Sequence, residues 1–152
     1  MNIYACDAVC QVKELFRDAP ISDFATTFDL LEAHSTILLE AHRAQNEVVK
    51  FQIGSWHPTL VGKPIDEILA ASFSLDDARA TIAREFGFKD FENAKLESTE
   101  FDQSFETCVD LVLAGEIEKL AQRLNSDSGL VRQTSSFGHR ATLLNYLGSN
   151  GV

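Results

Sequence analysis

Two of the three cysteines and two of the four histidines form the first set of residues in this chain that could bind a metal ion. Cys6 and Cys10 are four residues apart, so they share a face if that segment is helical, and His34 or His42 could complete the set. Zinc ligand pairs usually sit closer together on turns, and no His-Glu-x-x-His pattern occurs. We therefore predict no metal or other cofactor: the cysteines belong to the core, one histidine is half-buried and the other lies at the surface.

A serine–histidine pair is the second arrangement that could do chemistry. His139 follows Ser135 and Ser136, but no Gly-x-Ser-x-Gly elbow is present and no acid is placed to orient the histidine. The glycines are scattered, so neither a phosphate loop nor a dinucleotide fingerprint is present. The acidic residues are explained as helix caps and solvated faces. These patterns favour recognition over catalysis, and we predict that the chain is not an enzyme.

The acidic balance of the chain narrows its partners. The 152 residues suffice for one domain with a real core, and they include 13 basic and 23 acidic side chains, a formal net charge of -10. The basic residues form no cluster, so neither nucleic acid nor a membrane surface is an expected partner. An odd number of cysteines suits a reducing compartment, and the N-terminal residues do not form a signal-peptide pattern. We predict a cytoplasmic protein that meets other proteins.

Apolar residues recur at helical spacing and no segment alternates like a strand, which predicts an all-α fold. Residues 28–53 form one long helix or two helices broken near 45–46, with Ser22 or Asp23 as the cap. Ser74 and Asp77 form a capping-box pattern for a helix that ends at Gly87. Three further short helices are expected: residues 3–17, one after Pro64, and one after Asp90 with Phe91, Ala94 and Leu96 facing inward. Residues 105–113 and 117–124 should form a helical hairpin joined at Gly115, and a last helix, 142–149, should follow a polar loop.

From Phe105 onward the sequence resembles the beginning of an ankyrin-repeat array. The resemblance rests on VDLVLAGEIEKL at 109–120, on 130–131, on ATLLNYL at 141–147, and on the ~33-residue ankyrin period between 114–115 and 150–151. Upstream, 41–43, 56–58 and 73–88 look like the helical leader found ahead of ankyrin-like repeats in some bacterial proteins. The resemblance implies a helical leader over residues 1–100 packed on antiparallel helix pairs, about one and a half repeats over residues 101–152, in one continuous unit.

The chain departs from the ankyrin consensus in ways that bear on function. Where a repeat begins with Thr-Pro-Leu-His, residues 142–145 read Thr-Leu-Leu-Asn, and the amide of Asn145 could bond the Thr142 hydroxyl. The second helix of that repeat is missing, which leaves the apolar side of 142–149 uncovered. An uncovered apolar edge predicts an interface. It is buried by a partner, by a second copy in a homodimer or by folding back on the leader, unless the chain is truncated.

The leading hypothesis is a non-catalytic protein–protein interaction module. The loop 126–140 would be the projecting finger of the repeat, and fingers are a usual contact surface of such arrays. Two alternatives stay open: a small helical ligand-binding protein or enzyme with a cleft near Trp56 and His57, and a structural homodimer only. The predicted partner-binding residues are Phe137, His139 and Arg140 on the loop and Leu143, Leu144 and Leu147 on the open edge.

Overall fold

The computed structural model describes residues 7–149, and in this range the chain is helical with no strand. This confirms the all-α prediction for the described residues. None of these helices combines the length and the apolar character that a bilayer crossing requires. The elements are α1 (Asp7–Leu15), the 3₁₀ helix η1 (Ile21–Asp23), α2 (Thr27–Arg43), α3 (Val49–Trp56), α4 (Ile65–Ala70), α5 (Leu75–Glu85), α6 (Phe91–Leu96), α7 (Gln103–Ala114), α8 (Ile117–Ser126), the 3₁₀ helix η2 (Ser128–Arg132) and α9 (Leu143–Ser149).

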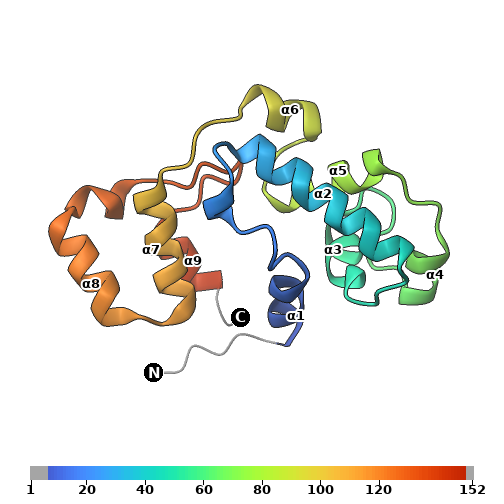
Figure 1. Ribbon diagram of the computed structural model, residues 1–152, viewed down its shortest axis with the longest axis horizontal. Helices are drawn as coiled ribbons and strands as arrows, with labels where there is room; N and C mark the ends of the chain where they lie inside the picture. Colours follow the sequence, from blue (N-terminus) through green and yellow to red (C-terminus); the bar gives the residue numbers. More distant parts are fainter. Residues whose placement is uncertain (1–6, 150–152) are drawn as a thin grey trace.

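Helix α2 is the centre of the first half of the molecule (Figure 1). Leu30, Leu31 and Leu38 form its apolar side and are fully buried, because α3 and α5 pack against it. Leucines at these spacings share one face of a helix, and such a stripe is buried when a second helix covers it. The core of this half therefore sits between α2 and α5.

The two ends of α2 differ in how well the sequence predicted them. Its cap is Thr26, whose hydroxyl oxygen accepts a hydrogen bond of 3.2 Å from a backbone N–H of the first turn. The predicted caps Ser22 and Asp23 lie in η1 instead, so that prediction was wrong. After α2, Gln45 has a φ of 57°, a left-handed conformation that a helix cannot continue through. Residues 28–53 therefore form two helices, broken where the sequence suggested.

Helix α5 begins and ends as the sequence predicted. The N–H of Ser74 donates to Asp77 Oδ2 at 2.8 Å, and the N–H of Asp77 donates to Ser74 Oγ at 3.2 Å, which completes both halves of the capping box. Gly87 follows the helix with a φ of 81°. Only glycine adopts this conformation without a steric penalty, so it ends the helix.

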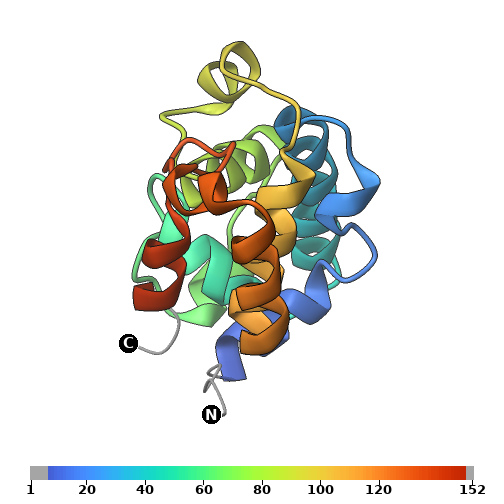
Figure 2. The same cartoon turned by 90° about the vertical axis from the view of Figure 1, so that its left-hand side faces the viewer.

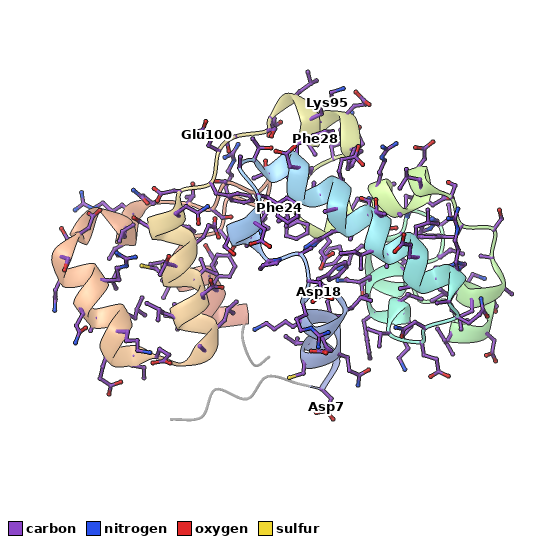
Figure 3. All side chains as sticks on the ribbon, in the orientation of Figure 1. Asp7, Asp18, Phe24, Phe28, Lys95 and Glu100 are labelled. Atoms are coloured by element: carbon purple, nitrogen blue, oxygen red, sulfur yellow. The ribbon has the colours of Figure 1, made fainter. Side chains whose placement is uncertain are left out.

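Helix α6 packs over the start of α2, where Lys95 and Phe28 lie close together (Figure 3), with Lys95 Nζ 5.9 Å from the centroid of the Phe28 ring. Ala94 is buried as predicted, but Leu96 is 85% exposed. The inward prediction for Leu96 was wrong because it lies two positions beyond Ala94, about 200° around the helix. Its side chain therefore points away from the core.

Helices α7, α8 and α9 form the other half of the molecule (Figures 1 and 2). Gly115 ends α7 with a φ of 71°, and α8 runs back beside it as the predicted hairpin. Helix α9 packs on α7. These helices and η2 enclose a second core, which comprises Phe105, Cys108, Val109, Leu130 and Leu143.

The segment between η2 and α9 joins the two halves. The ring centroid of Phe137 lies 4.4 Å from that of Phe86 and 5.6 Å from that of Phe101, inside the core of the first half. The backbone N–H of His139 donates to the Phe86 carbonyl oxygen at 3.3 Å. The prediction of a polar, projecting finger was therefore wrong for this stretch: burying a phenylalanine is favourable, and the nearest apolar surface is the end of α5.

Candidate functional site

Helix α9 carries three leucines predicted to contact a partner. Leu144 and Leu147 are 75% and 50% exposed, three positions apart on one side of the helix. Leu143 is buried in the second core, so its assignment to the contact surface was wrong. The expected bond between Asn145 and the Thr142 hydroxyl is present: Asn145 Oδ1 accepts from the N–H and from the hydroxyl of Thr142, both at 2.8 Å.

Of the three predicted contact residues on the loop ahead of α9, two lie at the surface and one lies in the core. His139 and Arg140 are exposed. Phe137 is 3% exposed, so its assignment to the contact surface was wrong, because its ring fills the core of the first half. The serines are engaged elsewhere: Ser135 Oγ accepts from the N–H of Phe137 at 3.2 Å, and Ser136 Oγ donates to a backbone carbonyl at 3.4 Å.

The histidines considered as metal ligands are core residues. His34 and His42 are both buried, and each bonds a backbone carbonyl oxygen through Nε2, at 3.0 and 2.8 Å. The prediction that one of these histidines is half-buried and the other lies at the surface was therefore wrong. Both can be buried because a neutral imidazole that is hydrogen-bonded to a backbone carbonyl is tolerated in a core. Cys10 is exposed, not buried, and Cys6 lies outside the described residues. Within residues 7–149 no three metal-binding side chains gather.

The predicted cleft near Trp56 and His57 is a groove of about 620 Å³ that Trp56 borders together with Arg84 and Lys89. His57 does not line it. The ring of His57 is buried, and its Nδ1 accepts from two backbone N–H groups at 3.1 Å each. Its Nε2 lies 3.5 Å from Asp77 Oδ1, so this histidine ties the end of α3 to the start of α5.

A second pocket lies between the two halves of the molecule and has a volume of about 260 Å³. Helices α5, α7 and α9, η1 and the loop with Phe137 all contribute to its walls. Much of its surface is apolar. Five titratable side chains also line it: Glu85, Glu106, Asp110, His139 and Tyr146. We call this the acidic pocket.

Glu106 is the most confined of these side chains, with only 4% of its surface exposed. Within the described part of the chain, neither of its carboxyl oxygens has a hydrogen-bond partner of normal geometry. Burial raises the pKa of Glu106 to about 7, and the charge of Asp110 adds to the rise. A backbone hydrogen bond from Ser136, which does not reach normal geometry, lowers the pKa in opposition to these effects. The pocket therefore holds an acid that changes its charge near neutral pH.

Glu85 repeats this situation on α5. Its Oε1 accepts a hydrogen bond of 2.7 Å from Gln52, while its buried Oε2 has no partner among the described residues. Burial raises the pKa of Glu85 to about 7, against the opposing effect of the Gln52 bond. Burial likewise raises the pKa of Asp110, and the nearby charge of Lys13 on α1 lowers it. Glu85 and Glu106 thus both line this pocket, with carboxyl oxygens that are themselves buried.

The acidic pocket was not predicted, although the sequence contains a signal for it. Glu106 stands next to Phe105 and three positions before Val109, at the edge of the apolar stripe of α7. Glu85 holds the equivalent place on α5, three positions after Ile82. A carboxylate at the edge of an apolar stripe is buried only when another part of the chain covers it. Here the covering segments lie far away in the sequence, so the pattern on one helix could not reveal the burial.

Comparison of the chain with family models, with curated proteins and with solved structures finds no match in any of the three.

Proposed function

We propose that this chain is a non-catalytic protein–protein interaction module, built as an ankyrin-like helix pair and a half on a helical leader. Its contact surface is the exposed side of α9 at Leu144 and Leu147, together with His139 and Arg140 just ahead of the helix. One observation carries the proposal: α9 buries one side against α7 and leaves two leucines exposed on the other. Adjacent exposed leucines favour an interface.

The order of the last three helices supports the ankyrin-like part of the proposal. Helices α7 and α8 form a hairpin, and after a loop that reaches sideways the chain returns to place α9 beside α7 (Figures 1 and 2). Ankyrin arrays stack successive helix pairs in this manner, and each pair covers the apolar side of the one before it. No described helix covers the outer side of α9.

The surroundings of His139 support a non-catalytic role. A nucleophile and its base need to lie within hydrogen-bond reach of each other. The hydroxyl groups of Ser135 and Ser136 bond the backbone, and His139 Nδ1 accepts from the backbone N–H of Ala141 at 3.1 Å. The serine–histidine pair considered from the sequence is therefore not assembled.

Replacing Leu144 with aspartate tests the α9 surface. Because the side chain is exposed, we expect Leu144→Asp to change the free energy of unfolding by no more than about 0.5 kcal/mol. A charge in an apolar contact should weaken association about tenfold or more. Size-exclusion chromatography with light scattering measures self-association, and circular dichroism checks that the variant is folded.

Leu96→Asp is the matched control, because it places the same charge at an exposed leucine on α6, in the other half of the molecule. If the wild type is a dimer, Leu144→Asp should be a monomer and Leu96→Asp a dimer. If the wild type is a monomer, proteins captured from a native lysate by the wild type and by Leu96→Asp should be lost with Leu144→Asp. Equal behaviour of all three proteins in both measurements would contradict the proposal.

Ligand binding in the groove beside Trp56 is the second candidate function. Two features of the groove favour ligand binding. Its volume is about 620 Å³, and the indole of Trp56 lies beside Arg84 and Lys89, a combination that suits an anionic ligand with an apolar part. A thermal-shift screen of anionic metabolites tests this candidate. A specific rise in Tm that Trp56→Ala abolishes would support it.

A further inference from the structure

The groove beside Trp56 forms where the ends of two packed helices and two loops meet. The last turn of α3 contributes Trp56 and the last turn of α5 contributes Arg84, while Val61 and Lys89 come from the segments that follow these helices. Trp56 is 42% exposed and Val61 is 56% exposed, so the groove presents apolar surface to solvent. Apolar surface beside a few polar groups in a concave place is typical of a ligand site.

Hydrogen bonds within the chain hold both loops of the groove in place. The loop with Val61 is fixed by two backbone N–H groups that donate to His57 Nδ1 and by the N–H of Gly62, which donates to a backbone carbonyl of α3 at 2.9 Å. On the other side, the N–H of Lys89 donates to Asn93 Oδ1 at 3.2 Å. A ligand therefore meets walls that are already ordered, so its binding costs little conformational entropy.

The groove is positively charged although the chain is negative overall. Arg84 and Lys89 both line it, and among the described residues no acidic side chain does so. The acids next to them in the sequence have other partners: Glu85 accepts a hydrogen bond of 2.7 Å from Gln52, and Asp90 caps α6. Within residues 7–149 neither cationic side chain forms an ion pair. The groove therefore offers two positive charges to an anion.

A structural role accounts for only part of this charge. Arg84 lies in the last turn of α5, where a cation offsets the negative end of the helix dipole. The ends of α3 and α5 are each equivalent to about half an elementary charge. The N–H groups of Gly87 and Phe88 also bond carbonyl oxygens at the end of α5, at 3.1 and 2.9 Å. Two full positive charges exceed what these helix ends require, so a positive excess remains in the groove.

We propose that the groove binds a small phosphate monoester with an aromatic ring, an inference that rests on the second candidate function, ligand binding at this site. The ring packs on the indole of Trp56, and the phosphate lies between Arg84 and Lys89. Arginine binds phosphate through paired hydrogen bonds and lysine binds it as a point charge, so the phosphate oxygens serve both at once. Aromatic pairs gain energy beyond the area that they bury.

The size of the groove favours a small molecule over a peptide. Its volume of about 620 Å³ lies in the range of small-molecule sites. A peptide is bound along an exposed sheet edge or an extended groove, and no strand is present among the described residues.

Isothermal titration calorimetry of the full chain with phenyl phosphate tests the proposal. Phenol and inorganic phosphate each carry one half of the ligand and should bind at least tenfold more weakly. Trp56 is the only tryptophan, so quenching of its fluorescence by phenyl phosphate shows that the ring reaches the indole. Because both cations are exposed, raising NaCl from about 50 to about 500 mM should weaken the binding several-fold.

Two charge-removing variants locate the phosphate. Arg84→Gln and Lys89→Gln change exposed side chains, so both proteins should fold, and each should bind phenyl phosphate at least about fivefold more weakly. Arg132→Gln is the matched control, because it removes an exposed charge on η2 in the other half of the molecule and should leave the affinity unchanged. Circular dichroism checks that all variants are folded.

Four results would overturn the proposal: equal binding of phenol, retained affinity when Arg84→Gln and Lys89→Gln are combined, no binding of phenyl phosphate at millimolar concentration, or a blocked phosphotyrosine peptide that binds at least tenfold more tightly than phenyl phosphate. The last would assign the groove to a protein partner. If phenyl phosphate fails while another anionic metabolite raises Tm and Trp56→Ala abolishes that rise, the inference is wrong and the second candidate function stands. Leu144→Asp should retain phenyl phosphate binding, because the α9 surface lies in the other half of the molecule.

Discussion

Glu106 and Glu85 are single residues that make this fold less stable than it could be. An ionised carboxyl group is expensive to bury even beside one hydrogen bond, such as the one that Glu85 accepts from Gln52, and burial accordingly raises the pKa of both groups to about 7. A tenfold change in an acid dissociation constant corresponds to about 1.4 kcal/mol, so ionising either group costs about 3 kcal/mol more in the folded chain than in water. Glutamine or an apolar residue at either position would avoid this cost.

Replacing Glu106 with glutamine should therefore stabilise the protein. The folded-state pKa lies above the value of 4.5 for a free glutamate, so the folded chain binds more protons than the unfolded chain between these pH values. The free energy of unfolding should fall as pH rises from 4.5 to about 7 in the wild type, and Glu106→Gln should remove one such contribution. We expect a gain of about 2–3 kcal/mol at pH 8 and little at pH 5.

Urea unfolding of the two proteins at both pH values measures this effect. The difference in unfolding free energy between wild type and Glu106→Gln isolates the effect of Glu106. His34, whose pKa is lowered by burial, contributes equally to the pH dependence of both proteins. Glu118→Gln controls for the loss of one exposed charge. A Glu106→Gln protein that is less stable than the wild type at pH 8 would show that Glu106 is a structural anion.

At the scale of single elements, the end of α5 shows how one glycine serves two purposes. Gly87 needs its left-handed φ of 81° to end the helix, and a Cβ at this position would also lie 2.3 Å from the backbone nitrogen of His139. The loop can approach this closely only because Gly138 is a glycine too: a Cβ there would lie 2.6 Å from the carbonyl oxygen of Gly87. The approach fixes the position of the loop relative to α5.

Gly87→Ala and Gly62→Ala form a matched pair that separates the two effects. Both glycines have similar φ values, 81° and 72°, but a Cβ on Gly62 meets nothing within 4 Å. Gly62→Ala should therefore lower the free energy of unfolding by about 1–2 kcal/mol, the cost of the left-handed conformation. Gly87→Ala should lower it by at least about 2 kcal/mol more, because the loop has to move. Equal losses in chemical denaturation would mean that the loop yields without cost.

At the scale of the whole molecule, Phe137 couples the two cores. Its ring packs with Phe86 and Phe101 in the first core, although the loop that carries it leads into α9 of the second. Between the two halves lies the acidic pocket, to which both contribute. Loss of Phe137 should therefore separate the halves as well as destabilise them.

Phe137→Ala is expected to destabilise the protein by about 3–5 kcal/mol and to break the cooperativity of unfolding. Trp56, the only tryptophan, reports on the first half by fluorescence, while circular dichroism reports on all helices. The two transitions should coincide in the wild type and separate in Phe137→Ala. Leu130→Ala, which removes a buried side chain of the second core alone, serves as the comparison. Coincident transitions in Phe137→Ala would contradict the coupling.

Local signals in the sequence predicted most of the helices. The capping box at Ser74, the left-handed glycines 87 and 115 and the break near 45–46 are encoded within a few residues, so they were legible without the fold. The exposure of the leucines on α9 was predicted in part. Leu144 and Leu147 are exposed, but Leu143 is buried, because an apolar stripe does not reveal which of its members a neighbouring helix covers.

By itself, the sequence determined that the described chain is helical and where several of its helices begin and end, since capping and periodicity act over one or two turns. Only the tertiary structure decided which side chains are inside. It buried Phe137, His34 and His42, and it brought Glu85 and Glu106, 21 positions apart, to one cavity. Burial and pKa depend on what distant segments place around a side chain, and that arrangement is set by packing of the whole chain.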